Sequence, residues 1–130
     1  SRMLVTGGRL LCLDIQRGML DVLAGRLAEA GADNAGLAVA DAMHLPLATA
    51  SVDRAFLVTV LGEVPDPDAA LAELRRVLRP GGLLGFCESL GDPDIVILGK
   101  LRNLCGRRGF EEIACYRNPL GYTAVFRPPS

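Results

Sequence analysis

The sequence predicts an α/β fold: a doubly wound, mostly parallel sheet that ends in an antiparallel hairpin. Short apolar segments alternate with helical spacing patterns along residues 9–108, an arrangement typical of parallel sheets with crossover helices. Two final strands are expected at residues 110–117 and 121–127, joined by the turn Asn118-Pro119-Leu120-Gly121. That connection is too short for a parallel crossover, so these two strands should be antiparallel.

Composition limits the function classes. The length of 130 residues predicts one domain over residues 1–130, and a hydrophobic content of 50% with 22% charged residues predicts a packed core. The net charge of −1 gives no basic footprint for nucleic acid and no basic helix for a membrane surface. No apolar run approaches the roughly 20 residues that a membrane span needs.

The four cysteines show no C-x-x-C spacing, and no spacing typical of a metal site is visible. Cys12 and Cys87 lie inside apolar strand candidates, while Cys105 and Cys115 lie in other segments. Reduced thiols in a cytoplasmic protein are therefore expected rather than disulfides.

The first strand, residues 9–14, carries four apolar residues in a row and ends on Asp14. Such a run is typical of a strand buried on both faces. Ligands of open α/β sheets bind outside the carboxyl ends of the strands. Asp14 could therefore accept hydrogen bonds from both hydroxyls of a nucleotide ribose. The alternative is that Asp14 only caps the helix that follows at residues 17–30.

The second strand, residues 36–40, also ends on an acid, Asp41. A loop over residues 42–51 and a third strand over residues 52–60 come next. Asp14, Asp41 and the loop Thr59–Glu63 thus follow three successive strands at one edge of the predicted sheet. This convergence favours a nucleotide-type site there.

The next helix has a strong start signal, because Asp66 can cap it, Pro67 suits its first position and Asp68 its first turn. Pro80-Gly81-Gly82 should end this helix. A fourth strand is expected at residues 83–87, followed by Glu88, and a further helix near residues 95–108 should close at Gly109.

Five segments carry family-like motifs: Leu13-Asp14-Ile15, Asp41-Ala42-Met43-His44-Leu45-Pro46-Leu47, Ser51-Val52-Asp53, Leu61 to Asp66 and Leu74 to Gly82. Together they resemble class I S-adenosylmethionine-dependent methyltransferases, especially the branch that includes menaquinone and ubiquinone pathway enzymes. Their order matches over roughly residues 9–90. The resemblance implies a Rossmann-like fold, S-adenosyl-L-methionine as cofactor and methyl transfer to a small-molecule acceptor.

The resemblance also implies roles for five residues. Asp14 would hold the ribose hydroxyls, and Ile15 would pack on the adenine face. Asp41 would accept from the adenine amino group, with the Ala42 backbone beside it. Thr59 would line the methionine end. No catalytic side chain is assigned, because positioning the acceptor in line with the methyl can provide much of the catalysis.

The start of the chain departs from the family pattern. Family members carry an earlier strand and a glycine-rich turn before the ribose acid, whereas only 13 residues precede Asp14 here, and Gly7-Gly8 comes before a strand. We therefore expect an N-terminally truncated domain that lacks this strand and motif, with little methyl transfer by residues 1–130. Such a sheet is expected to rearrange or to form a homodimer.

Other polar residues have simpler interpretations. His44, the one histidine, is expected to be exposed in a loop, and Glu63 is either a solvated acid or a substrate contact. Arg75, Arg76 and Arg79 are expected on a solvated helix end.

Two alternative functions stay open: a non-catalytic methyltransferase-like domain or partner subunit, and a nicotinamide dinucleotide-binding domain.

Overall fold

The computed structural model of the chain describes residues 10–14, 17–29, 35–39, 41–58, 61–89, 91 and 95–129. These residues belong to two compact units, residues 1–42 and 43–130, and each unit is described by itself. The single domain expected over residues 1–130 stays a prediction. Within the described ranges, no helix has the length and apolar character needed to cross a membrane.

The first unit contains the predicted strand–helix–strand arrangement. It consists of β1 (Leu10–Asp14), α1 (Arg17–Glu29) and β2 (Ala35–Val39). The two strands pair in parallel, with Leu10 opposite Ala35 and Asp14 opposite Val39. The carboxyl ends of both strands therefore lie at the same edge of this two-stranded sheet.

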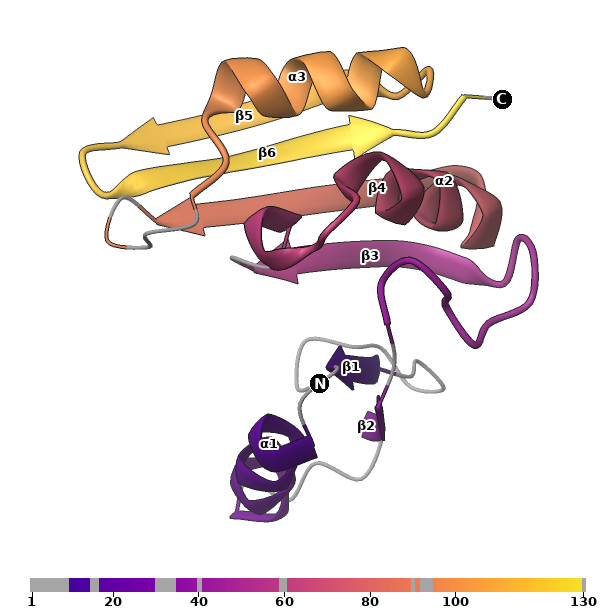
Figure 1. The fold of residues 1–130 in the computed structure, drawn as a ribbon, viewed down its shortest axis with the longest axis vertical. Helices are drawn as coiled ribbons and strands as arrows, with labels where there is room; N and C mark the ends of the chain where they lie inside the picture. The colour runs from indigo at the N-terminus through magenta and orange to yellow at the C-terminus, as the bar shows by residue number, and fades with distance from the viewer. Residues whose placement is uncertain are drawn as a thin grey trace. The chain divides into compact units, whose positions relative to one another are not determined.

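The second unit is built on a four-stranded sheet (Figure 1). Its elements are β3 (Val52–Val58), the 3-10 turn η1 (Leu61–Glu63), α2 (Pro67–Val77), β4 (Leu78–Ser89), α3 (Leu98–Arg107), β5 (Glu111–Asn118) and β6 (Gly121–Arg127). The strand order is β3-β4-β6-β5, with β3 parallel to β4 and β6 antiparallel to both of its neighbours. One antiparallel strand in an otherwise parallel sheet is the predicted topology, and the α/β fold class is confirmed.

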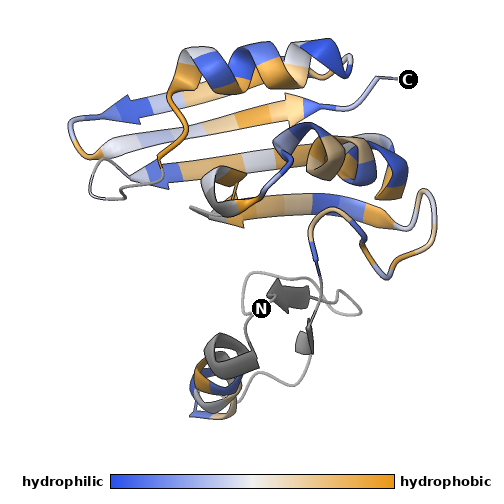
Figure 2. Cartoon of the chain, in the orientation of Figure 1, coloured by the Kyte–Doolittle hydropathy of each residue, from blue (hydrophilic) through white to orange (hydrophobic). Residues whose placement is uncertain are grey.

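The core of this unit lies between the sheet and its two helices. Strand alternation places Leu84 and Phe86 of β4 beside Ala124 and Phe126 of β6, and all four side chains are buried. The rings of Phe86 and Phe126 meet edge to face, with centroids 5.8 Å apart. Figure 2 shows α2 and α3 with mixed apolar and polar faces, as expected for helices that cover one side of a sheet.

The end of α2 differs from the prediction that Pro80-Gly81-Gly82 terminates it. The helix ends at Val77, and Leu78 is already extended at the first position of β4. The Pro-Gly-Gly segment instead forms an irregularity inside β4, because Val52 pairs with Leu78 whereas Arg54 pairs with Leu83. Gly82 is needed there, since a Cβ would lie 2.8 Å from the carbonyl oxygen of Asp53.

The start of α2 agrees with the sequence. Asp66 is extended, its carboxylate accepts a hydrogen bond from the Ala69 N–H at 3.2 Å, and Pro67 opens the helix.

Three cysteines, Cys87, Cys105 and Cys115, are free thiols, and burial raises the pKa of Cys105 to about 12. The side chain of Cys12 lies outside the described residues.

Asp66→Ala should lower the free energy of unfolding by about 1 kcal/mol, because it removes the acceptor for an unpaired helix N–H. Asp66→Asn, which keeps an acceptor oxygen, should cost much less. Chemical denaturation followed by circular dichroism measures both variants. Equal losses in the two would show that the cap hydrogen bond is not the source of the stabilisation.

Candidate functional site

The predicted cofactor acids lie at the carboxyl edge of the two-stranded sheet in the first unit. Asp14 is the last residue of β1, and its register partner Val39 is the last residue of β2. Asp41 follows two residues later and is half-buried, with Ala42 in a turn directly after it. Two acids at the ends of adjacent parallel strands are suited to binding a group rich in hydroxyl and amino donors, such as a nucleoside.

Other predicted positions cannot be placed in this way. Ile15 and Thr59 lie outside the described residues. The segment of residues 1–9 does so too, and the expected lack of the first strand and glycine motif stays a prediction. Glu63 is the last residue of η1, but its side chain also lies outside the described part of the chain. Their predicted roles stay predictions.

The loop that follows Asp41 is bound to α2 by two side chains. Glu73 accepts a hydrogen bond from the Leu45 N–H at 2.7 Å through Oε2. Arg76 donates to the carbonyl oxygens of Leu45 and Leu47 at 3.1 and 2.9 Å, and to Thr49 Oγ1 at 3.4 Å. We call the Glu73–Arg76 pair the loop clamp.

Backbone groups complete the attachment of this loop. The N–H groups of Ala50 and Ser51 donate to the carbonyl oxygens of Arg76 and Val77, at 2.9 and 2.8 Å. These are carbonyls that the last turn of a helix leaves without partners. The expectation that Arg76 points into solvent is therefore wrong, because its guanidinium satisfies backbone carbonyls of a neighbouring loop.

The two clamp side chains are also bound to each other. Arg76 Nε donates to Glu73 Oε1 at 2.7 Å, and Nη2 donates to Oε2 at 3.0 Å. This two-point pairing is the main reason why the pKa of Glu73 lies below its ordinary value, and the Leu45 N–H adds to the effect. The spacing of three residues on one helix face was a sequence signal for this ion pair, but not for its contacts with the loop.

A second polar group that sequence reasoning missed lies near the carboxyl end of β4. Glu88 is 4% exposed and stands opposite Tyr122 of β6. The Tyr122 hydroxyl donates to the carbonyl oxygen of Val96, just before α3. Burial and the nearby Glu88 carboxylate raise the pKa of Tyr122. The alternation Leu84, Phe86, Glu88 already indicated that this acid shares the buried face.

Comparison with known proteins identifies the family. A family model described as a methyltransferase domain matches residues 1–86. The chain belongs to the methyltransferase domain family. This confirms the resemblance that the sequence motifs suggested.

Curated relatives of the methyltransferase domain agree. A ubiquinone/menaquinone biosynthesis C-methyltransferase from Acidiphilium cryptum is 48% identical over 82 residues, which cover 62% of this chain and 32% of the relative. A malonyl-[acyl-carrier protein] O-methyltransferase from Methylococcus capsulatus is 49% identical over 76 residues, 58% of this chain and 27% of the relative. The chain spans about a third of the length of the curated relatives it matches.

Solved structures share the fold. A SAM-dependent methyltransferase from Aquifex aeolicus superposes with a TM-score of 0.87 at 16% identity, covering 96% of this chain and 71% of that chain. At such low identity the likeness concerns the fold alone, and it agrees with the predicted Rossmann-like architecture.

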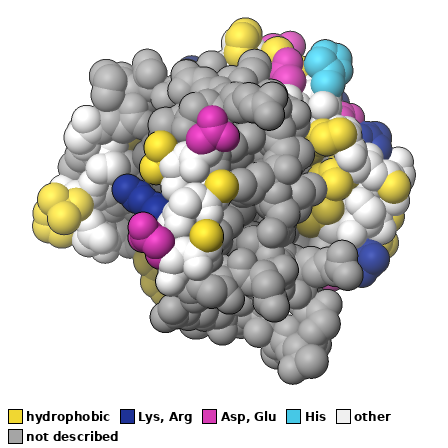
Figure 3. Space-filling view, turned by 90° about the horizontal axis from the view of Figure 1, so that it is seen from below, with side chains coloured by type: hydrophobic (Ala, Val, Ile, Leu, Met, Phe, Trp, Pro, Cys, Tyr) yellow, Lys and Arg dark blue, Asp and Glu magenta, His cyan; other side chains and the backbone are white. Residues whose placement is uncertain are grey.

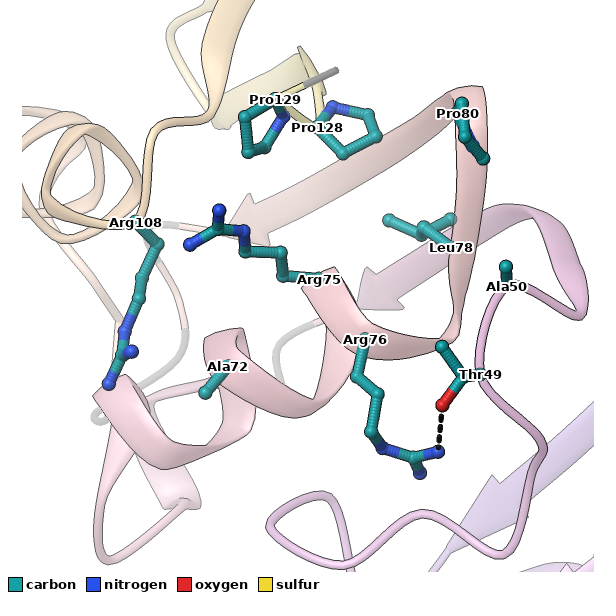
Figure 4. Close-up of a pocket in the computed structure, with 10 residues that line it drawn as sticks. All are labelled: Thr49, Ala50, Ala72, Arg75, Arg76, Leu78, Pro80, Arg108, Pro128 and Pro129. Carbon is teal, nitrogen blue, oxygen red and sulfur yellow. Dashed lines mark hydrogen bonds between the residues drawn. The ribbon is translucent and has the colours of Figure 1, made fainter.

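A groove of about 410 Å³ lies elsewhere on the second unit of the methyltransferase domain (Figure 4). Arg75 points into it, while Arg76, next along α2, points to Thr49. Leu78 and Pro80 on its wall mark the amino end of β4, the opposite end from that where α/β sheets bind ligands. We assign this groove no part in cofactor binding.

The histidine, His44, is exposed as predicted and visible in cyan in Figure 3.

The loop clamp should make the free energy of unfolding depend on pH. Because the pKa of Glu73 is lowered in the folded protein, the unfolded chain takes up a proton at higher pH than the folded one. The stabilisation is present above the unfolded pKa and is lost as the pH falls through the folded value. The difference in unfolding free energy between the wild type and Glu73→Gln should therefore be largest near neutral pH and shrink below about pH 4.

Denaturation curves at a series of pH values measure this difference. Glu111→Gln is the matched control, because its exposed ion pair with Arg127 should contribute little at any pH. A difference between the wild type and Glu73→Gln that stays constant down to pH 3 would contradict the assignment.

Proposed function

We propose that the protein binds S-adenosyl-L-methionine at the carboxyl edge of β1 and β2. Asp14 would accept from the two ribose hydroxyls, and Asp41 from the adenine amino group beside the Ala42 backbone. The observation that supports the proposal is the parallel register of the two strands, in which Asp14 stands opposite Val39, two residues before Asp41 in the chain. Family membership supports the choice of this cofactor over a nicotinamide dinucleotide. Ile15 and Thr59 would complete the site.

We further propose that the reaction is methyl transfer to a small-molecule acceptor. When bound, the cofactor would supply an activated methyl group on a sulfonium, with S-adenosylhomocysteine as the leaving group. The chain's part is then to orient the nucleoside and to hold the acceptor in line, which can lower the barrier by several kcal/mol. Relatives named for ubiquinone and menaquinone biosynthesis and for malonyl-[acyl-carrier protein] support this acceptor class.

Asp14→Asn should weaken binding of S-adenosylhomocysteine by about 1–3 kcal/mol, because the amide is neutral and offers one acceptor oxygen in place of two. Isothermal titration calorimetry measures the dissociation constants. Asp21→Asn, an exposed acid on α1, is the matched control and should bind as the wild type does.

Two outcomes would contradict the proposed site. Equal binding by the wild type and Asp14→Asn would remove Asp14 from it. Tighter binding of NAD than of S-adenosylhomocysteine by the wild type would favour the dinucleotide alternative over the methyltransferase assignment.

We also propose that the protein forms a homodimer in the cytoplasm. The free thiols Cys87, Cys105 and Cys115 support a reducing compartment. β5 is an edge strand of the four-stranded sheet, and its Ile113 and Tyr116 are 46% and 68% exposed, which supports pairing with another chain. Multi-angle light scattering should give twice the mass of one chain, and a monomer at micromolar concentration would contradict the proposal.

A further inference from the structure

We infer that the groove beside Arg75 binds an organic oxyanion, a small molecule in which a carboxylate or phosphate group is joined to an apolar body. Arg75 pairs with the oxyanion, and the apolar body lies against the walls of the groove (Figure 4). All residues that line the groove belong to the second unit. The inference goes beyond the proposed function, which makes no use of this groove, so either can fail without the other.

The groove carries a positive charge that no acid of its described lining neutralises. Three arginines, Arg75, Arg76 and Arg108, line it, and the described lining includes no aspartate or glutamate. Arg76 is paired with Glu73, and Arg108 donates to both carboxylate oxygens of Asp68, at 2.9 and 2.6 Å. Arg75 makes no hydrogen bond or ion pair within the described part of the chain. Its guanidinium points into the groove and is therefore available to a ligand.

The carboxyl end of α2 does not need Arg75 as a cap. Cations in the last turn of a helix often pair with its final carbonyls. In α2, carbonyls of this turn already accept from the backbone N–H groups of Leu78, Ala50 and Ser51. This pairing leaves the Arg75 guanidinium free to turn towards the groove.

Apolar side chains line much of the groove. Leu78 and Pro80 of β4 contribute to it, as do Pro128 and Pro129, whose rings are rigid and carry no backbone N–H. Pro129 packs close to Gly109, where an added Cβ would lie 3.3 Å from Pro129 Cγ. The volume of about 410 Å³ lies within the range of roughly 300–1,000 Å³ that is typical of small-molecule pockets. These surfaces favour a ligand with an apolar body over a bare inorganic anion.

The backbone on the loop side of the groove is held in an uncommon conformation. Ala50 has a φ of 53°, in the left-handed region that residues with a Cβ rarely adopt. Its N–H donates to the Arg76 carbonyl at 2.9 Å, and its carbonyl accepts from Arg79 Nε at 3.2 Å. Strained residues that their neighbours hold in place are common at ligand sites. The loop side of the groove is thus formed before a ligand arrives, which lowers the ordering cost of binding.

The class of ligand follows from the shape of the guanidinium group. Its planar fork of N–H donors forms two parallel hydrogen bonds with a carboxylate or phosphate, and such charge-assisted bonds are stronger than neutral ones. A lysine ammonium attracts the same anions but lacks the fork. Arg75→Lys should therefore keep part of the binding, whereas Arg75→Gln should lose most of it.

The test is a titration of the full chain, in which NMR chemical-shift changes measure binding. The ligands are benzoate, phenyl phosphate and inorganic phosphate, with benzamide as the uncharged counterpart of benzoate. The organic anion that binds better should shift the Arg75 Nε–H signal and the amide signals of Thr49 and Ala50 in a saturable way, and its identity assigns a carboxylate or a phosphate. Inorganic phosphate should bind more weakly than phenyl phosphate, and benzamide more weakly than benzoate.

Arg75→Gln should weaken binding of the better organic anion by about tenfold or more, the effect of lost hydrogen bonds to a charged group. Arg75→Lys should fall between Arg75→Gln and the wild type. Because Arg75 is exposed, both variants should keep the fold, which circular dichroism checks. Arg107→Gln is the matched control: it removes the same charge from an exposed arginine that does not line the groove, and it should bind as the wild type does.

Four outcomes would overturn the inference. They are equal binding of the better organic anion by the wild type and Arg75→Gln, equal binding of benzoate and benzamide, equal binding of phenyl phosphate and inorganic phosphate, and no saturable shift with either organic anion at millimolar concentrations. None of them bears on the proposed cofactor site, which binding of S-adenosylhomocysteine tests separately.

Discussion

The attachment of the irregular loop to α2 depends on the need to satisfy backbone polar groups. Residues 45–51 form no ladder of their own, so their N–H and carbonyl groups need partners elsewhere. The last turn of α2 has the complementary need, because its final carbonyls lack helical donors. The loop and the helix provide hydrogen-bond partners for each other. The N–H groups of Ala50 and Ser51 donate to the last carbonyls of α2, and Arg76 donates to the loop carbonyls. Leu45-Pro46-Leu47 and the helix before Leu-Arg-Pro-Gly-Gly, which belong to separate motifs in the sequence, are thus joined by hydrogen bonds.

The parts of the fold that depend on local signals could be predicted from the sequence, whereas those that depend on pairing between distant residues could not. Strands and helices were predictable because apolar periodicity and end signals are local, as with the cap Asp66 and the closing Gly109. The single antiparallel strand followed from the length of one turn. The end of α2 was not predictable, because Leu78 leaves the helix to pair with Val52, a residue distant in sequence. Glycine and proline mark a break, but strand pairing decides on which side of the break the strand begins.

The candidate site divides in the same way. The positions of Asp14 and Asp41 at strand ends follow from patterns read within a few residues, and the parallel register of β1 and β2 agrees with them. The role of Arg76 does not follow, because three arginines near a helix end look alike in sequence. Arg75 faces a groove, whereas Arg79 makes an exposed ion pair with Asp53 and donates to the Ala50 carbonyl at the end of the loop. Arg76 instead binds the carbonyls of Leu45 and Leu47. That difference depends on the rotation of α2 against the loop, which no local pattern contains.

The charges at the end of α2 explain why this arrangement needs both members of the pair. Partial negative charge at a helix carboxyl end favours a cation, so Arg76 gains from the helix as well as from the loop carbonyls. A lone guanidinium there would leave the Leu45 N–H without a partner, whereas a lone Glu73 would stand near the negative end of the helix. With both present, the Leu45 N–H and the carbonyls of Leu45 and Leu47 all have charged partners, and the net charge of the pair is zero. The loop is thus held by hydrogen-bond geometry, which salt screens much less than it screens attraction between exposed charges.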